Sequence, residues 1–185
     1  MDIVIRELAV GDENMWRNID DSFTVDFALV LSSSGGEFKF TVKPITPGYT
    51  KSYSEEQFKE AEDEDYSEYI DNSDQIVYLA WAENQVAGRV VLKRNWNKYA
   101  LVEDIAVDKN YRGHGIGRKL IEQAKRWAKN GGMPGIMLET QSNNVNACKF
   151  YKSCGFVIGG LDHYLYQGIY KNSNEIAIFW YLIFE

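Results

Sequence analysis

The sequence has 185 residues, 45% of them hydrophobic and 25% charged, which is typical of one globular domain, so we expect a single domain over residues 1–185. Its net charge of −7 disfavours nucleic acid and anionic membrane surfaces as partners and favours a small cationic one. The first residues do not resemble a signal peptide and no apolar run reaches the roughly 20 residues that cross a bilayer, so we expect a cytoplasmic protein.

The first 48 residues are the hardest part of the chain to interpret. Alternating hydrophobic residues predict a strand from Ile3, and a weak helix is expected around Trp16. Two further strands, 27–31 and 38–42, are expected on either side of a turn, after which prolines and a glycine break the pattern. These residues carry no recognisable site.

An acidic segment follows. Residues 54–74 contain ten acidic residues and one lysine, so this segment carries a charge of −9 and the rest of the chain about +2. Ser54 with Gln57 three residues later is typical of a helix capping box, and the apolar residues after it favour a helix that ends near Asn72. Its charges could attract a polycation or could simply face solvent.

The remaining elements are clearer. Two β-rich runs, 75–83 and 86–92, predict a hairpin with its turn at Asn84-Gln85, and 100–107 predicts the next strand. Residues 116–128 repeat hydrophobic side chains at helical spacing. A strand, a helix and two closing strands are then expected over 135–140, 144–153, 156–166 and 176–184. The last strand could support a homodimer or complete the core.

A glycine-rich turn joins the strand at 100–107 to the helix at 116–128. Glycines let the backbone approach an anion closely, and the first N–H groups of a helix lack partners and lie at the positive end of its dipole. The spacing of Gly113, Gly115 and Gly117 differs from the dinucleotide fingerprint and from the nucleotide P-loop. Coenzyme A is therefore the better pyrophosphate candidate, although a turn without a ligand would also use glycines.

Two blocks of residues resemble a known family. Arg112-Gly113-His114-Gly115-Ile116-Gly117 is similar to the Arg/Gln-x-x-Gly-x-Gly/Ala signature of the GNAT superfamily of acetyl-CoA-dependent N-acetyltransferases. The family's second block corresponds to Asn144-x-x-Ala147-x-x-x-Tyr151-x-x-x-Gly155-Phe156. The resemblance implies an α/β (α+β) fold: a mixed, mostly antiparallel central sheet of about seven strands, flanked by about four helices, with splayed central strands.

From about residue 49 onward the chain also resembles the streptothricin acetyltransferases. The resemblance rests on Tyr69-Ile70-Asp71-Asn72, Asn95-Trp96-Asn97, Glu103-Asp104-Ile105-Ala106-Val107, Leu138-Glu139-Thr140-Gln141 and Phe179-Trp180-Tyr181-Leu182. It implies acetylation of an amine on the β-lysine chain of streptothricin, which confers antibiotic resistance. The alternatives are an acetyltransferase for polyamines, aminoglycosides or protein amines, and a CoA-binding sensor without catalysis.

The resemblance also implies how acetyl-CoA binds. Backbone groups of three residues of the 100–107 strand would pair with the pantetheine arm as an added strand does, and Asn144 would reach the coenzyme from the other side. The pyrophosphate would lie on backbone N–H groups of the turn, where the position of His114 tolerates many side chains. The expected cofactor-binding residues are thus Ile105, Ala106, Val107, Arg112, Gly113, His114, Gly115, Ile116, Gly117, Arg118, Asn144 and Tyr151. No metal is expected, because the two histidines and the cysteines lack zinc-ligand spacing.

Proton transfer is the other chemical requirement. An alkylammonium must lose a proton before it attacks a thioester, and Glu103 is the first candidate base, with Glu139 or a water chain as alternatives. Tyr151, at the place where the family commonly has a tyrosine, would protonate the departing CoA thiolate.

The acceptor residues follow from the same strand. Its sequence resembles that of polyamine acetyltransferases, in which the residue corresponding to Asp104 helps to hold the cationic substrate. Successive strand residues point to opposite faces, so Glu103 and Asp104 can share one site only if the strand carries a bulge. Tyr69, Trp96 and Glu139 are the other substrate-binding candidates.

Overall fold

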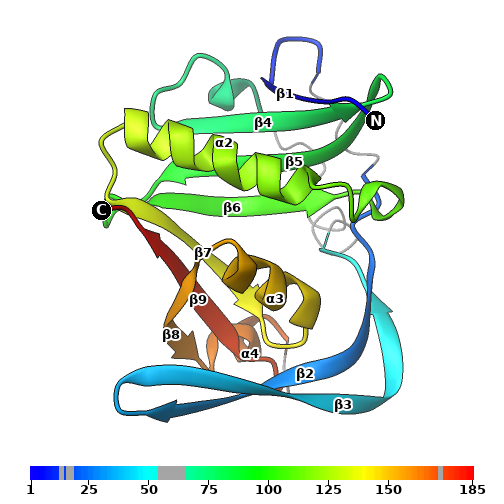
Figure 1. The fold of residues 1–185 in the computed structure, drawn as a ribbon, viewed down its shortest axis with the longest axis vertical. Helices are drawn as coiled ribbons and strands as arrows, with labels where there is room; N and C mark the ends of the chain where they lie inside the picture. Colours follow the sequence, from blue (N-terminus) through cyan, green and yellow to red (C-terminus); the bar gives the residue numbers. More distant parts are fainter. Residues whose placement is uncertain (13–14, 16–18, 54–65, 171–172) are drawn as a thin grey trace. The chain divides into compact units, whose positions relative to one another are not determined.

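The structure, a computed structural model, describes residues 1–12, 15, 19–53, 66–170 and 173–185. The chain folds into two units (Figure 1). The first unit comprises Met1–Phe23 and Ser52–Ile136, and the second comprises Thr24–Lys51 and Met137–Glu185. The helix predicted around Trp16 and most of the acidic segment lie outside the described residues. The single domain over the whole chain stays a prediction.

Four strands of the seven-stranded main sheet belong to the first unit, in the order β1-β4-β5-β6 with antiparallel neighbours. Their bounds are Ile3–Glu7, Gln75–Ala82, Gln85–Arg94 and Ala100–Val107. Glu83 and Asn84 form the β4–β5 turn, and both have positive φ (51° and 63°), as a two-residue type I′ turn requires. The prediction of this turn at Asn84-Gln85 was therefore one residue too late.

Both faces of this half-sheet are covered. Helix α2 (Ile116–Asn130) packs on one face (Figure 1), and Gly88 of β5 has no room for a side chain there, because a Cβ would lie 2.9 Å from the Ala106 carbonyl oxygen and 3.1 Å from Ile116 Cγ2. On the other face Tyr69, at the end of the short η2 helix (Tyr66–Tyr69), packs against an opposite-face cluster made of Leu8, Ile19, Val77, Leu79, Val91 and Ala106. This double cover explains why β4 and β5 are almost continuously hydrophobic.

The second unit contains most of β7 and all of β8 and β9, in the sheet order β7-β9-β8, and its described residues form two α-helices. The elements are β7 (Gly135–Gln141), α3 (Val145–Ser153), β8 (Val157–Asp162), α4 (Leu165–Ile169) and β9 (Ala177–Ile183). The strand expected over 156–166 was too long. Asp162 Oδ1 accepts hydrogen bonds from the backbone N–H groups of Tyr164 and Leu165, and this turn ends β8 and starts α4.

A separate two-stranded sheet pairs β2 (Phe23–Ser34) with β3 (Glu37–Lys51). These strands are much longer than the predicted 27–31 and 38–42. Pro44 and Pro47 lie inside β3, because a strand of a two-stranded sheet has one unpaired edge where a missing N–H disrupts no ladder.

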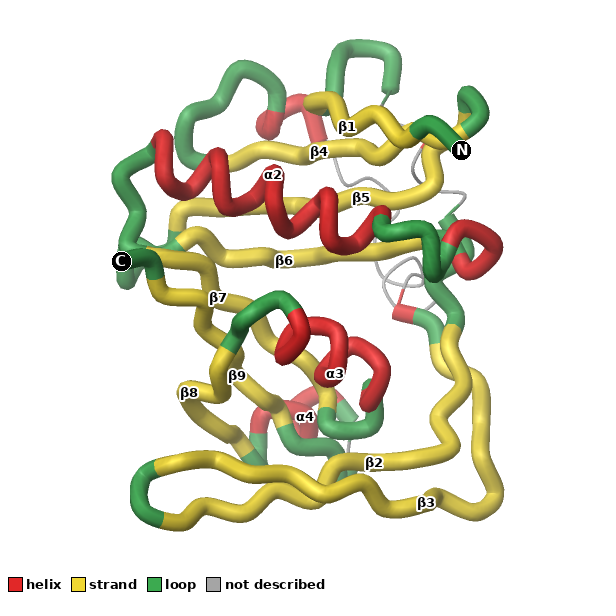
Figure 2. Tube along the Cα trace, viewed as in Figure 1, coloured by secondary structure: helices red, strands yellow, loops and turns green. Residues whose placement is uncertain are grey.

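The observed elements agree with the predicted fold class. Figure 2 shows how helices and strands alternate in the described part of the chain. Of the three α-helices found there, α2 and α3 were predicted and α4 was not. The two other predicted helices, around Trp16 and in the acidic segment, fall mostly on residues outside the described ranges. The predicted splay of the central strands concerns the relation between the two units and stays a prediction. No helix within the described ranges is both long enough and apolar enough to span a bilayer.

Candidate active site

The glycine turn has the backbone geometry expected of an anion site. Gly113 and Gly115 both have a φ of 82°, a left-handed backbone conformation that residues other than glycine rarely adopt. Gly115 is the N-cap of α2, which begins at Ile116, so the capping residue has no side chain of its own to cover the first N–H groups of the helix. An anion at this helix start would meet both these N–H groups and the positive end of the helix dipole.

The signature arginine braces this turn. Arg112 Nε donates to the carbonyl oxygen of Val107 at 3.0 Å, and Arg112 Nη1 donates to that of Ser22 at 2.8 Å. Asp108 Oδ2 accepts from the backbone N–H of Asp20 at 3.0 Å, and Lys109 Nζ lies 2.5 Å from Asp20 Oδ2. The Lys109 ion pair, together with hydrogen bonds from Ser22, lowers the pKa of Asp20 to about 2. Residues near position 20 thus fix the N-terminal part of the turn, over residues 108–112.

Strand β6 carries the bulge that the shared carboxylate site requires. In the β5–β6 register Val91 pairs with Asp104 and Leu92 pairs with Val102, so Glu103 is an extra residue without a partner. Val91 belongs to the opposite-face cluster, so Asp104 points toward that face. Tyr69, which packs on the same cluster, donates from its hydroxyl to Glu103 Oε2 at 3.1 Å. Glu103 and Asp104 therefore both reach the face away from α2.

The two carboxylates differ in their ion pairs. Asp104 Oδ2 accepts from Arg89 Nε at 2.5 Å, and the Arg89 side chain is only 3% exposed. Glu103 is exposed and lies 3.8 Å from Lys93 Nζ, whose side chain is half exposed. Asp104 is thus held in a close, buried pair, whereas the pair of Glu103 is long and screened by solvent.

The second predicted block lies in the second unit. Asn144 is the N-cap of α3, and its Oδ1 accepts from the backbone N–H of Ala147 at 3.1 Å. Tyr151 is 6% exposed, and its ring packs against those of Phe156 and Trp180 with centroids 5.8 and 6.3 Å away. These contacts fix the position of the phenol that was predicted to act as the acid.

Glu139 has an environment of its own on β7. The hydroxyl of Tyr166, on α4, donates to Glu139 Oε1 in a short hydrogen bond. Burial is the main cause that raises the pKa of Glu139, and nearby Glu175 adds to it, while the Tyr166 hydrogen bond and Lys51 act against it. Glu139 is therefore a half-buried carboxylate that a proton or a cation would stabilise.

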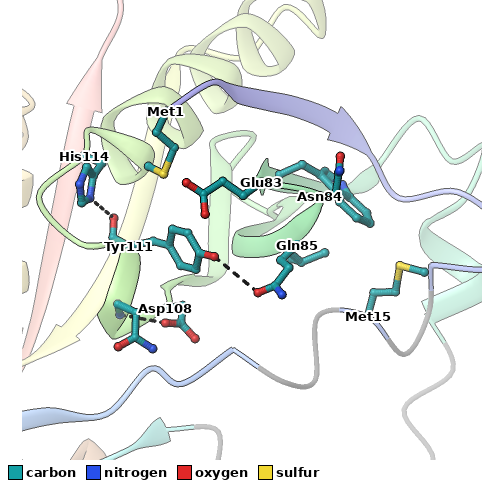
Figure 3. A pocket seen from close by; sticks show the side chains of 11 residues that line it. Met1, Met15, Glu83, Asn84, Gln85, Asp108, Tyr111 and His114 are labelled. Carbon is teal, nitrogen blue, oxygen red and sulfur yellow. Dashed lines mark hydrogen bonds between the residues drawn. The ribbon is translucent and has the colours of Figure 1, made fainter.

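Other predicted residues are more exposed. Trp96 is 90% exposed in the turn between β5 and β6. Exposed His114 has its Nδ1 3.2 Å from the Tyr111 carbonyl oxygen and lines a cavity of about 760 Å³ beside the β4–β5 turn (Figure 3). Glu103 and Tyr69 are absent from the described lining of this cavity, which is therefore not the predicted acceptor site.

Over the described ranges, no group of three or more His, Cys, Asp or Glu residues could hold a metal ion.

Sequence reasoning missed several partners of the predicted residues. Arg89, Asp20 and Tyr166 each bond to a site segment from 15 to 88 positions away in the chain. The lone arginine in the β-rich run 86–92 was the one available signal, because a buried arginine needs a carboxylate. Nothing local in the sequence indicated the other two.

Comparison with known proteins identifies the class. The chain belongs to the acetyltransferase (GNAT) family, whose model matches residues 45–156. It is therefore an acetyl-CoA-dependent N-acetyltransferase that acts on an amine, in agreement with the fold and the glycine turn.

Two named relatives are similar over most of their length. Streptothricin acetyltransferase A of Bacillus subtilis (strain 168) is 44% identical over 165 residues, which cover 89% of this chain and 91% of the relative. A streptothricin acetyltransferase of Escherichia coli is 37% identical over 84% of this chain and 80% of its own.

Solved structures are similar as well. A Bacillus anthracis str. Ames protein, crystallised with acetyl coenzyme A and assigned as a streptothricin acetyltransferase, has a TM-score of 0.90 and 52% identity over 99% of this chain and 100% of its own. A nourseothricin acetyltransferase has a TM-score of 0.78 and 29% identity over 98% of each chain.

Proposed function

We propose that this N-acetyltransferase transfers the acetyl group of acetyl-CoA to an amine on the β-lysine chain of streptothricin and so confers resistance to that antibiotic. The observation that carries the proposal is the 44% identity to the B. subtilis streptothricin acetyltransferase over 89% of the chain. That similarity reaches well beyond residues 45–156, which match the general family model.

The glycine turn fits the coenzyme. Backbone N–H groups over 112–118 would bind the pyrophosphate, because two positive-φ glycines and a helix N-terminus present donors without obstructing side chains. The backbone of Ile105, Ala106 and Val107 would pair with the pantetheine arm, and Asn144 would also contact the coenzyme. Acetyl-CoA supplies the activated acetyl group when bound.

The chain's own side chains would then move two protons. Glu103 would take the proton from the acceptor ammonium, directly or through a water, and its exposed carboxylate beside Tyr69 supports this role. Tyr151 would donate a proton to the departing sulfur, and its buried, packed ring supports a fixed hydroxyl position. Asp104, Tyr69, Trp96 and Glu139 would contact the acceptor.

Further properties belong to the same proposal. The enzyme would work without a metal, in the cytoplasm, as one domain, and without binding nucleic acid or membranes. The aromatic strand β9 would be the contact if the enzyme forms a homodimer.

An amine panel tests the acceptor. Streptothricin, spermidine, an aminoglycoside and a lysine peptide are each assayed with acetyl-CoA, and thiol release is followed with Ellman's reagent. The kcat/KM for streptothricin should be the highest of the four. A far higher kcat/KM for another amine would move the assignment to that amine. Binding of acetyl-CoA without thiol release for any amine would instead identify a sensor.

A further inference from the structure

The second unit contains a polar cluster formed by Lys51, Glu139, Gln141, Asn143 and Glu175, called here the β7-end cluster. Lys51 Nζ lies 3.1 and 3.2 Å from the two carboxylate oxygens of Glu175. Asn143 Nδ2 donates to Glu175 Oε1 at 2.7 Å and to the Tyr49 hydroxyl at 2.9 Å. The Lys51 side chain is only 7% exposed, so this network is largely shielded from water.

The charges of the cluster do not balance. Lys51 uses its ammonium on both oxygens of Glu175, which leaves Glu139 with the neutral phenol of Tyr166 as its donor. Among the described residues no lysine or arginine lies within ion-pair distance of Glu139. Two carboxylates against one ammonium give the cluster a formal charge of −1 when both are ionised.

Two buried acceptors in the cluster also lack donors. Asn143 Oδ1 and Gln141 Oε1 have no hydrogen-bond partner among the residues that the structure describes, and their residues are 4% and 5% exposed. The orientation of the Asn143 amide is set by Glu175, because a carboxylate only accepts, so the amide NH₂ must face it. The oxygen on the same amide group is consequently left as a buried acceptor without a donor among the described residues.

Strand geometry puts Gln141 beside Glu139. The hydroxyl of Thr140 contacts Cys148 Sγ of α3 at 3.3 Å, so Thr140 faces that helix. Residues on either side of it point to the opposite face of β7, where Tyr166 of α4 meets Glu139. Glu139 and Gln141 therefore present a carboxylate and an amide oxygen on one face.

Within the described ranges, what the cluster lacks is a positively charged group with several hydrogen-bond donors. We infer that the β7-end cluster is a subsite for an alkylammonium or guanidinium group of the acceptor, bound by Glu139, Gln141 Oε1 and Asn143 Oδ1. An ammonium has three donors and a guanidinium five, which suits two carbonyl oxygens and a carboxylate. The inference rests on the proposed function, because it assigns a second cationic group to the amine substrate.

Calorimetry with two amines that have the same five-carbon chain tests the subsite. In the presence of CoA, 1,5-diaminopentane should bind at least about tenfold more tightly than 1-aminopentane, because it alone carries a second ammonium. E139Q keeps an oxygen for the Tyr166 hydroxyl and should abolish this advantage. The control E122Q, which removes a carboxylate paired with Lys125 on α2, should keep it. Equal affinities in the unmodified enzyme, no binding of either amine, or an advantage that survives in E139Q would overturn the subsite.

A second variant separates a ligand site from a structural one. Gln141→Met removes a buried acceptor without changing side-chain length, so it should raise the melting temperature while weakening binding of 1,5-diaminopentane by about threefold. If water alone occupies the cluster, Gln141→Met should leave diamine binding unchanged, and the inference fails.

Failure of the inference differs from failure of the proposed function. The calorimetric result does not require turnover, whereas the proposed function requires thiol release with streptothricin. An enzyme that acetylates streptothricin but shows no diamine advantage would keep its proposed function and lose this subsite.

Discussion

The two units provide their carboxylates with different partners. In the first unit Asp20, Asp104 and Glu103 each have a cation within 4 Å, at distances of 2.5, 2.5 and 3.8 Å. In the second unit Glu139 has a phenol, and Lys51, the one cation of the β7-end cluster among the described residues, is held by Glu175. The close pairs fix the glycine turn and the strand bulge. Glu103 has only a long pair and Glu139 has none among the described residues, which is why we propose that these two carboxylates act on the substrate.

The largest expected effect separates the two available carboxylates by role. E103Q should lower kcat/KM for streptothricin by about a hundredfold or more without changing the KM for acetyl-CoA, because it removes the base but leaves the glycine turn intact. E139Q should instead raise the KM for streptothricin and leave kcat nearly unchanged. Steady-state kinetics of both variants check this, and an E139Q enzyme with collapsed kcat would exchange the two assignments.

The buried pair at the bulge gives the next effect. Arg89→Met leaves Asp104 without its cation and should lower the free energy of unfolding by about 3 kcal/mol. Arg94→Met removes an exposed ion pair with Asp74, in which the arginine side chain is 35% exposed and the aspartate side chain 69%. This change should lower the free energy of unfolding by less than about 1 kcal/mol. Urea denaturation of both variants gives the comparison. Equal losses would mean that the Arg89 pair does not support the bulge.

Local patterns in the sequence predicted the backbone structure of several candidate-site segments, and long-range contacts explain what these patterns missed. The glycine turn and the start of α2 at Ile116 follow from residues that are adjacent in the chain. The bulge at Glu103 depends on how β6 pairs with β5, so it could be stated only as a condition. The environment of Glu139 comes from α4 and from residues 51 and 175, which no pattern around β7 reveals.

A smaller effect concerns how stability depends on pH. The raised pKa of Glu139 means that the native state binds more protons than the unfolded state between the ordinary value of 4.5 and the folded value. The unfolding free energy of the unmodified protein should therefore fall, relative to that of E139Q, as pH rises above about 4.5. Glu175, Lys51 and Tyr166 are unchanged in E139Q, so the difference isolates Glu139. Parallel stability curves from pH 4 to 8 would contradict the buried environment assigned to it.

The smallest expected effect has the opposite sign and comes from Asp20. Its pKa of about 2 lies below the ordinary value of 3.8, so the native state binds fewer protons than the unfolded state in that interval. The unmodified protein should lose stability relative to Asp20→Asn as pH falls from about 4 to about 2, and urea denaturation at several pH values measures the loss. Lys109→Met removes the main cause of the shift and should reduce this loss as Asp20→Asn does. If the unfolding free energy of both variants instead keeps its full dependence on pH, the Asp20 pair does not stabilise the glycine turn. The contrast between paired and unpaired carboxylates would then rest on Asp104 alone.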